Sequence, residues 1–228
     1  VEHIPLQQLT GEQDFMGLTF SVNEHVLIPR QDTEILVEEV LKELHDGMRV
    51  LDMCTGSGCI LLSLLHYSND CEGLGVDLSA EALEVAGRNV LKGLTPEKAE
   101  HAHFLQSDLF EKVEGKFEII VSNPPYIASA EVEKLMPEVR DHEPRMALDG
   151  TEDGLHFYRR IIEEAGKHLV SSGMLFFEIG YDQGQAVSEL MRTEGYCDVQ
   201  VVQDYAGLDR VVFGTYVTVQ PAPFAKSR

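Results

Sequence analysis

The chain has 228 residues, of which 18 are basic and 39 acidic, so its formal net charge is −21, and 43% of its residues are hydrophobic. That length fits one α/β domain with a sizeable core. The acid excess argues against direct nucleic-acid binding, because such affinity comes largely from Lys and Arg neutralising phosphates. It favours a basic or neutral protein partner. With no apolar run of membrane-spanning length and no signal peptide, we expect a cytoplasmic protein without membrane contact.

The cysteines and histidines give little sign of a metal site. The cysteines show no Cys-x-x-Cys spacing, so we expect free thiols and no bound metal. They are Cys54, Cys59, Cys71 and Cys197. His101 and His103 share one face of an expected strand, but a third ligand at suitable spacing is missing, so we expect a structural role for both.

Short β-rich runs alternate with amphipathic segments, which indicates βαβ units around a mainly parallel sheet. The first elements are a hairpin over residues 14–29 and a helix over 32–44, which opens on acidic residues. The strands that follow are expected at 49–53, 73–77, 101–106, 117–122, 173–179, 198–204 and 210–219. The remaining helices are expected at 57–66, 79–94, 152–170 and 183–194.

The last two strands are joined only by residues 205–209. A parallel crossover needs a helix, so this pair is expected to be antiparallel. We expect three parts in the chain: a hairpin and linker over 1–31, the α/β domain over 32–219, and a frayed tail over 220–228.

A glycine-containing turn follows the strand at 49–53 and consists of Cys54, Thr55, Gly56, Ser57 and Gly58. The two glycines let the backbone approach a small molecule, and the amides at the start of the next helix favour a negative group. The full G-x-G-x-x-G pattern is absent: Cys54 stands at the first glycine position of one possible register, and Leu61 at the last glycine position of the other. Tight packing alone is the other interpretation.

Acidic residues end the next two strands at the same edge of the sheet. Asp77, followed by Leu78, lies about twenty residues beyond the turn, where a ribose hydroxyl pair needs an acceptor. Ser79 is better placed to cap the following helix, which leaves Asp77 for a ligand. Asp108 is a candidate acceptor for an adenine amino group, with Leu109 packing the ring. Helix-entry or loop chemistry is the alternative for both acids.

Asn123, Pro124, Pro125 and Tyr126 follow the apolar strand at 117–122. Two successive prolines make this loop stiff. The Asn carboxamide and a proline carbonyl offer two acceptors to a planar NH₂ group, and Tyr126 offers a flat face to pack against it. An ordinary proline turn is the alternative.

Together these features resemble the Rossmann-like S-adenosylmethionine-dependent methyltransferases. Further segments are similar to the PrmC/HemK family, which methylates the glutamine of the Gly-Gly-Gln motif in peptide chain release factors. These segments are residues 27–34 (LIPRQDTE), 121–127, 143–150 (EPRMALDG), 153–155, 177–180 (FEIG) and 209–212 (DRVV). The resemblance runs from about Pro5 to Gly214.

The resemblance implies a class I methyltransferase fold: a seven-stranded, mostly parallel sheet with an antiparallel last strand, preceded by an N-terminal β-hairpin. It implies that S-adenosyl-L-methionine is the cofactor, held by residues 54–58, Asp77, Leu78, Asp108 and Leu109, with Asn123 facing both cofactor and substrate. Asn123 and the Pro124 carbonyl would accept the amide hydrogens of the glutamine, and Tyr126 would support the amide plane. The partner implied is a release factor.

Two departures from the family are visible. Full-length members usually carry a helical N-terminal domain, and this chain is expected to start after it. Cys54 stands where many relatives have glycine, which puts the backbone contact at that position in doubt.

Four other functions stay open. They are a ribosomal-protein glutamine methyltransferase, an adenine-N6 methyltransferase of nucleic acid, a nicotinamide-dependent reductase and a nucleotide-binding module without catalysis.

Three residue roles also stay open. Arg30 and Glu34 are candidates for the active-site entrance, with helix entry as the alternative for Glu34. Glu178 ends an apolar strand, where a buried carboxylate needs a partner.

Overall fold

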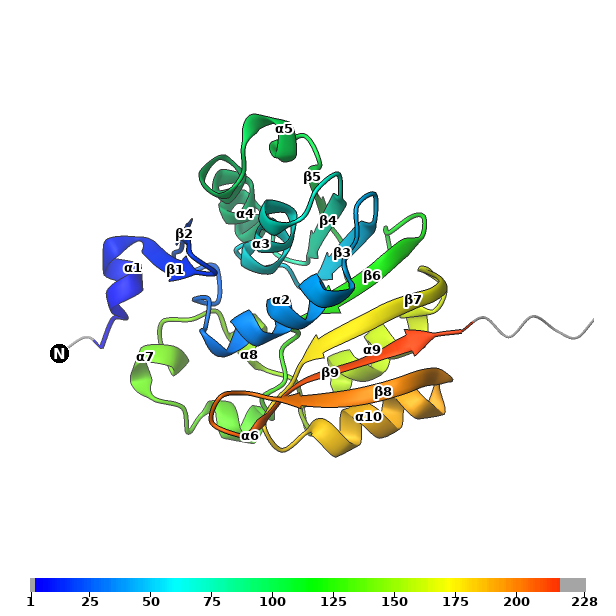
Figure 1. The fold of residues 1–228 in the computed structure, drawn as a ribbon. Helices are drawn as coiled ribbons and strands as arrows, with labels where there is room; N and C mark the ends of the chain where they lie inside the picture. The colour runs from blue at the N-terminus through cyan, green and yellow to red at the C-terminus, as the bar shows by residue number, and fades with distance from the viewer. Residues whose placement is uncertain (1–2, 218–228) are drawn as a thin grey trace, which may run out of the picture.

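The computed structural model describes residues 3–217. Within that range the main sheet has seven strands in the order β5-β4-β3-β6-β7-β9-β8 (Figure 1). The strands are β3 (Arg49–Met53), β4 (Glu72–Asp77), β5 (Ala102–Gln106), β6 (Phe117–Ser122), β7 (Leu169–Glu178), β8 (Tyr196–Gln203) and β9 (Asp209–Tyr216).

Pairing in this sheet follows the expected pattern. β3 pairs in parallel with β4 and with β6, and the parallel register continues to β5 on one side and β7 on the other. β9 runs antiparallel to both β7 and β8. The class I methyltransferase fold and its antiparallel last strand are therefore confirmed.

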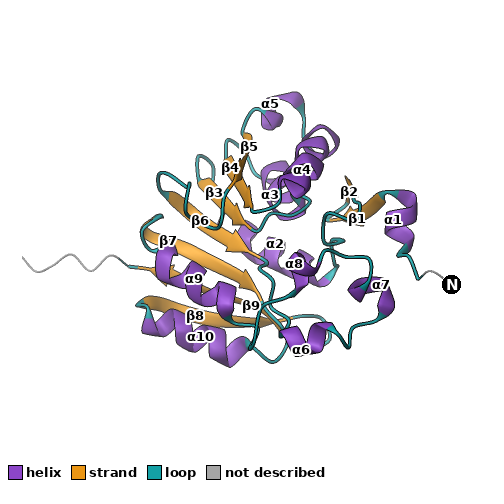
Figure 2. Ribbon diagram, turned by 180° about the vertical axis from the view of Figure 1, so that it is seen from behind, coloured by secondary structure: helices purple, strands orange, loops and turns teal. Residues whose placement is uncertain are grey.

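Helices cover both faces of the sheet, as the two opposite views show (Figures 1 and 2). One core cluster joins β3, β6, β7 and β9 to α2 and α3, and the other joins the opposite face of the same strands to α9 and α10. The longer helices are α2 (Asp32–Glu43), α3 (Cys59–Tyr67), α4 (Ala80–Gly93), α9 (His156–Ala165) and α10 (Gly184–Thr193). The short ones are α1 (Leu6–Thr10), α5 (Pro96–Ala99), α6 (Ser129–Val132), α7 (Pro137–Arg140) and α8 (Arg145–Leu148).

The N-terminal hairpin exists, but its expected position was wrong. It consists of β1 (Glu12–Phe15) and β2 (Leu18–Ser21), which are joined at Met16 and Gly17. Both turn residues have positive φ, 51° and 72°, as a tight two-residue hairpin turn requires. The later apolar run at 26–28, which was expected to be its second strand, lies in an irregular segment. We call this segment, residues 22–31, the strap.

The helix expected over 152–170 is much shorter in the structure, where α9 covers His156–Ala165. Thr151 and Gly154 both have positive φ, 72° and 73°, which a helix does not allow, and β7 already begins at Leu169. The last strand, expected to reach 219, ends at Tyr216. The tail expected over 220–228 lies outside the described residues. Within residues 3–217, no helix has the length and apolar character needed to cross a membrane.

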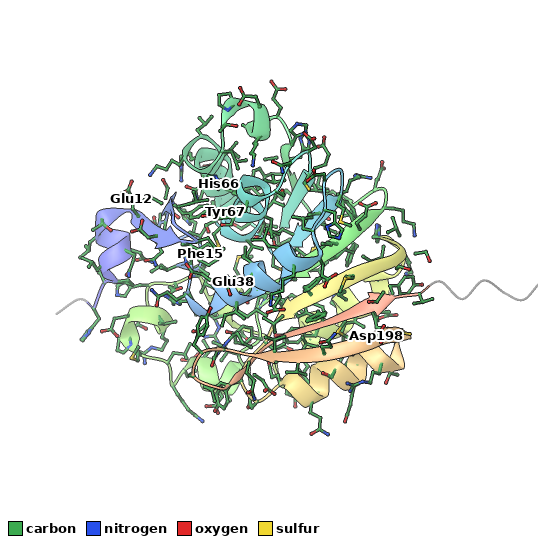
Figure 3. All side chains as sticks on the ribbon, viewed as in Figure 1. Glu12, Phe15, Glu38, His66, Tyr67 and Asp198 are labelled. Atoms are coloured by element: carbon green, nitrogen blue, oxygen red, sulfur yellow. The ribbon has the colours of Figure 1, made fainter. Side chains whose placement is uncertain are left out.

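The hairpin is attached to the domain by buried polar contacts as well as by its aromatic residues. Phe15 belongs to the core cluster that contains α2 and α3, and Tyr67 at the end of α3 donates its hydroxyl to the Met16 carbonyl at 2.6 Å (Figure 3). Asn89, fully buried in α4, accepts from the Ser21 N–H at 2.7 Å. It also donates to the carbonyls of Ser21 and Ser57, at 3.1 and 2.9 Å. One carboxamide therefore links the hairpin, α4 and the glycine turn.

We expect Asn89→Ala to lower the free energy of unfolding by about 2–3 kcal/mol, because it removes the partner of the part-buried Ser21 N–H and of the buried Ser57 carbonyl. Denaturant unfolding measures this loss. The matched control is Arg88→Ala, an exposed position on the same helix, which should stay within about 0.5 kcal/mol of wild type. Equal stability of the two variants would contradict the linking role of Asn89.

Candidate active site

A cavity of about 210 Å³ lies where the carboxyl ends of β3, β4, β5 and β6 meet the strap. The strand order reverses between β3 and β6, and ligands of open α/β sheets bind at such a point. The predicted residues that line the cavity are Cys54, Thr55, Gly56, Ser57, Asp77, Leu78, Asp108, Leu109, Asn123 and Pro125. Of the other predicted site residues in the described part of the chain, Gly58, Pro124 and Tyr126 are not in the lining.

The turn after β3 is left-handed at three positions. Cys54, Gly56 and Gly58 have φ of 64°, 54° and 79°, a conformation that is unfavourable for the cysteine and free of steric cost for the glycines. A Cβ on Gly58 would lie 3.2 Å from the Cβ of Ala86, so this glycine also allows α3 and α4 to pack closely. Tight helix packing at the turn is therefore observed, and the approach of a ligand to its backbone stays a prediction.

Asp52 lies beneath this turn. It is fully buried in β3, and its Oδ2 accepts the Thr55 hydroxyl at 2.6 Å. Its Oδ1 has no hydrogen-bond partner among the described residues. Burial raises the pKa of Asp52 to about 7, against the smaller opposing effect of the Thr55 bond.

Asp77 joins the end of β4 to the turn. Its Oδ2 accepts the Gly56 N–H at 2.8 Å and its Oδ1 accepts the Ser79 N–H at 3.0 Å. Burial raises the pKa of Asp77, and these backbone bonds oppose the shift. Ser79 caps α4 by accepting the Ala82 N–H, as predicted. Each Asp77 oxygen keeps acceptor capacity toward the cavity, because a carboxylate oxygen has more than one lone pair.

Asp108 and Leu109 form the third side of the cavity. Leu109 is buried with φ of 48°, and Asp108 pairs with Arg160 of α9 at 3.0 Å. Arg160 was not predicted from the sequence, because nothing in the local pattern distinguishes it from the other charged residues of its helix.

The loop that starts at Asn123 is held from behind. The Ser122 hydroxyl donates to the Met53 carbonyl at 2.6 Å and so joins the ends of β6 and β3. A Cβ on Gly154 would lie 2.3 Å from the Tyr126 carbonyl oxygen. Gln183 donates to that same oxygen at 3.0 Å. The loop therefore rests against residues 150–154 and the start of α10.

Within the loop, Tyr126 points away from the cavity. Its hydroxyl donates to Glu178 Oε1 at 3.3 Å, and burial raises the pKa of Tyr126. The expected packing of its ring against a substrate amide stays a prediction. By contrast, within residues 3–217 neither the Asn123 carboxamide nor the Pro124 carbonyl makes a hydrogen bond.

The strap closes the cavity on the side opposite the sheet. Val26 packs against Ala82 and Val85 of α4. At the other end, Glu143 is buried, accepts the Ile28 N–H at 3.2 Å and forms an ion pair with Arg30. Within the apolar run at 26–28, Val26 is therefore buried against α4, and Leu27 lines the cavity.

The residues whose roles were open now have partners. Arg30 lines the cavity and pairs with Glu143, whereas Glu34 accepts the Met16 N–H at 2.7 Å and helps to hold the hairpin.

His101 and His103 lie 2.7 and 3.5 Å from carboxylate oxygens of Glu72. Within residues 3–217, no group of three or more His, Cys, Asp or Glu side chains is placed to hold a metal ion.

Comparisons with known proteins agree with this geometry. Residues 30–139 match the family model described as the methyltransferase small domain. The release factor glutamine methyltransferase of Clostridium acetobutylicum is 46% identical over 214 residues, which cover 92% of this chain and 74% of that protein.

Two solved structures are similar as well. One is the release factor-specific protein-(glutamine-N5) methyltransferase of Alicyclobacillus acidocaldarius, with 31% identity and a TM-score of 0.50 over 87% of this chain and 99% of that chain. The other, a methyltransferase from Pyrococcus furiosus, has a TM-score of 0.62 over 88% of this chain and 90% of that chain. At 19% identity it supports the fold alone.

The raised pKa of Asp52 makes a specific prediction about stability. Because the folded-state pKa of about 7 lies above the ordinary value of 3.8, the folded state holds an extra proton between about pH 4 and pH 7. The contribution of Asp52 to stability is therefore largest below pH 4 and falls as the pH rises to 7. Relative to Asp52→Asn, wild type should lose up to about 4 kcal/mol over this window.

Denaturant unfolding from pH 4 to pH 8 checks this prediction. The control is Asp198→Asn, an exposed position at the amino end of β8, far from the cavity (Figure 3). It should change stability by less than about 0.5 kcal/mol at every pH. A constant difference between wild type and Asp52→Asn across the range would contradict the prediction.

Proposed function

Because the chain belongs to the family of release factor glutamine methyltransferases, we propose that it methylates the Gly-Gly-Gln glutamine of a peptide chain release factor through the loop at Asn123. The enzyme is an S-adenosyl-L-methionine-dependent protein-(glutamine-N5) methyltransferase. One observation carries the assignment of the loop. The Asn123 carboxamide, which lines the cavity, and the carbonyl of the adjacent Pro124 are two acceptors without a hydrogen-bond partner within residues 3–217.

The residues at the cavity fit S-adenosyl-L-methionine. The Asp77 carboxylate suits the two hydroxyl donors of a ribose, and the amides at the start of α3 favour the carboxylate of the methionine part. Leu109 and Phe157, which both line the cavity, suit the adenine ring. In this proposal Arg160 holds the Asp108 carboxylate in place, because the two form an ion pair at 3.0 Å.

The proposed chemistry relies on alignment. The bound cofactor supplies an electrophilic methyl group on its sulfonium. A glutamine amide nitrogen is a poor nucleophile, because its lone pair is delocalised into the carbonyl. Asn123 Oδ1 and the Pro124 carbonyl would accept the two amide hydrogens, orient the nitrogen and stabilise the positive charge that develops on it. Orientation of this kind contributes about 7–11 kcal/mol in well-aligned systems. As the new carbon–nitrogen bond formed and the methyl–sulfur bond broke, the nitrogen would gain a positive charge, and it would then lose one proton without a dedicated strong base.

The stiffness of the loop supports this assignment. Its two prolines restrict the backbone, and the contacts from Gly154 and Gln183 hold the end at Tyr126. Acceptors on such a loop keep their direction without bonds of their own. Little reorganisation is then required when the substrate arrives, which is the condition for effective electrostatic stabilisation.

The charge of the chain is consistent with a protein substrate. With a net charge of −21, the surface attracts basic proteins and repels phosphate backbones. We therefore propose a release factor as partner, without direct nucleic-acid binding. We propose the cytoplasm as the place of action, since release factors work on the ribosome.

We also propose the division into a hairpin region over 1–31 and a catalytic domain from residue 32 onward.

The direct test is mass spectrometry of a release factor after incubation with the protein and S-adenosyl-L-methionine. We expect one added methyl group on the Gly-Gly-Gln peptide, located on the glutamine by fragmentation. A release factor with Gln→Glu in this motif is the matched substrate control and should stay unmodified. Methylation of a ribosomal protein or of DNA in parallel reactions, with the release factor unmodified, would replace the proposal by one of its alternatives.

Asn123→Ala should lower kcat at least about 100-fold and leave cofactor binding within about threefold of wild type, because it removes an acceptor that acts on the substrate nitrogen. Calorimetry with S-adenosylhomocysteine measures binding, and the peptide assay measures turnover. Asn69→Ala, at an exposed position after α3, is the control and should behave as wild type. Near-normal turnover of Asn123→Ala would sink the proposed mechanism.

A further inference from the structure

Glu178 is a buried carboxyl group behind the loop at residues 123–126, which we call the catalytic loop. The proposed chemistry does not use Glu178. It ends β7 and is 2% exposed. Its Oε1 accepts the Tyr126 hydroxyl at 3.3 Å, and its Oε2 has no hydrogen-bond partner among the described residues. Burial raises the pKa of Glu178. A buried carboxyl group with an unpartnered oxygen is unfavourable for stability, so a role beyond packing is indicated.

The surroundings of Glu178 connect three parts of the active site. The Thr33 side chain, at the start of α2, and the positive charge of Arg210 both oppose this rise in the pKa of Glu178. Arg210 is fixed in turn by Asp204 at 3.0 Å and by the Ile179 carbonyl at 3.3 Å. Glu178 therefore lies where the start of α2, the antiparallel strand β9 and the loop at residues 123–126 come together.

Tyr126 is held by two different atoms. Its hydroxyl is bound by Glu178, and its carbonyl is bound by Gln183 at 3.0 Å. Together these bonds fix both the ring and the backbone of the last residue in the Asn-Pro-Pro-Tyr sequence. Because the Asn123 carboxamide makes no bond within the described chain, its direction depends on the backbone that Tyr126 holds.

We propose that Glu178 is a positioning residue for methyl transfer, which acts through the Tyr126 hydroxyl to hold the loop with Asn123 and the Pro124 carbonyl aimed at the substrate nitrogen. The inference rests on the proposed function of the loop. Glu178 itself touches neither substrate nor cofactor in this arrangement, since it is not among the residues that line the cavity.

The experiment compares Tyr126→Phe, Glu178→Leu and Glu178→Gln in steady-state methylation of a release factor. Tyr126→Phe and Glu178→Leu each remove the same hydrogen bond, so each should lower kcat about tenfold with an unchanged KM for S-adenosyl-L-methionine. The double variant should be no slower than either single variant, because the two residues act as one unit. Glu178→Gln keeps an acceptor for the Tyr126 hydroxyl and should retain kcat within about threefold of wild type.

Tyr196→Phe is the matched control. Its hydroxyl donates to the Ile162 carbonyl at 3.4 Å within the core on the α9 side, so its loss should leave kcat and KM unchanged. Independent effects of Tyr126→Phe and Glu178→Leu that multiply in the double variant would overturn the inference. The inference would also be overturned if Glu178→Gln lowered kcat as much as Glu178→Leu does, or if Tyr126→Phe had a normal kcat. Tyr126→Phe keeps the whole buried carboxyl group, so it should fold.

Failure of the proposed function gives a different result. Wild-type protein that leaves the release factor unmodified would remove the proposed function and the catalytic part of this inference together. Carbon-13 NMR of the seven tyrosines then still decides whether the contact exists. The Tyr126 ζ-carbon signal, assigned by its absence in Tyr126→Phe, should shift in Glu178→Leu and stay close to its wild-type position in Glu178→Gln. An unmoved signal in Glu178→Leu would overturn the contact itself.

Discussion

The active site depends on the parallel pairing of β3 with β6. This pairing lies where the strand order reverses, and it places the turn after β3 beside the loop after β6. The Ser122 hydroxyl, bound to the Met53 carbonyl at 2.6 Å, holds the two strand ends together at the point where both loops leave the sheet. A one-residue shift of this register would move the last side chains of β6 to the opposite face. The turn after β3 and Asn123 would then no longer line the same cavity.

Rigidity at the site comes from contacts on the side away from the cavity. Gly154 permits a backbone approach to Tyr126 that any side chain would prevent, and Gln183 fixes the same carbonyl. Asn89 holds the glycine turn in a similar way, because its carboxamide donates to the Ser57 carbonyl. These hydrogen bonds hold the loops from behind, whereas the Asn123 carboxamide and the Pro124 carbonyl make none within residues 3–217. This division allows a polar site to be both stiff and unsatisfied before ligands bind.

The sequence predicted the residues of this site whose signal is local. Asp77, Asn123 and the glycine turn follow apolar strands directly, and the spacing from the turn to Asp77 is set by one βαβ unit. Glu143 and Asn89 could not be predicted in this way, because each bonds to the strap or hairpin across 115 and 68 residues of chain. Such pairings depend on the tertiary fold. The prediction of a strand at 26–28 was wrong for a related reason. Apolar character predicts that a segment is buried, but it does not distinguish a strand from an irregular segment packed on a helix.

The acidity of the site suits a cationic ligand, independently of the net charge of the surface. Besides burial, the charges of Asp77, Asp52 and Asp108 each raise the pKa of the Cys54 thiol, which lines the cavity. In their ionised forms these carboxyl groups place negative charge beside the cavity. Burial disfavours the ionised forms of Asp52 and Asp77 when the cavity holds no cation, and a sulfonium nearby favours them. Because such coupling is reciprocal, the energy of burying these carboxyl groups is partly recovered on binding, and the same negative charge favours the positive charge that develops on the substrate nitrogen.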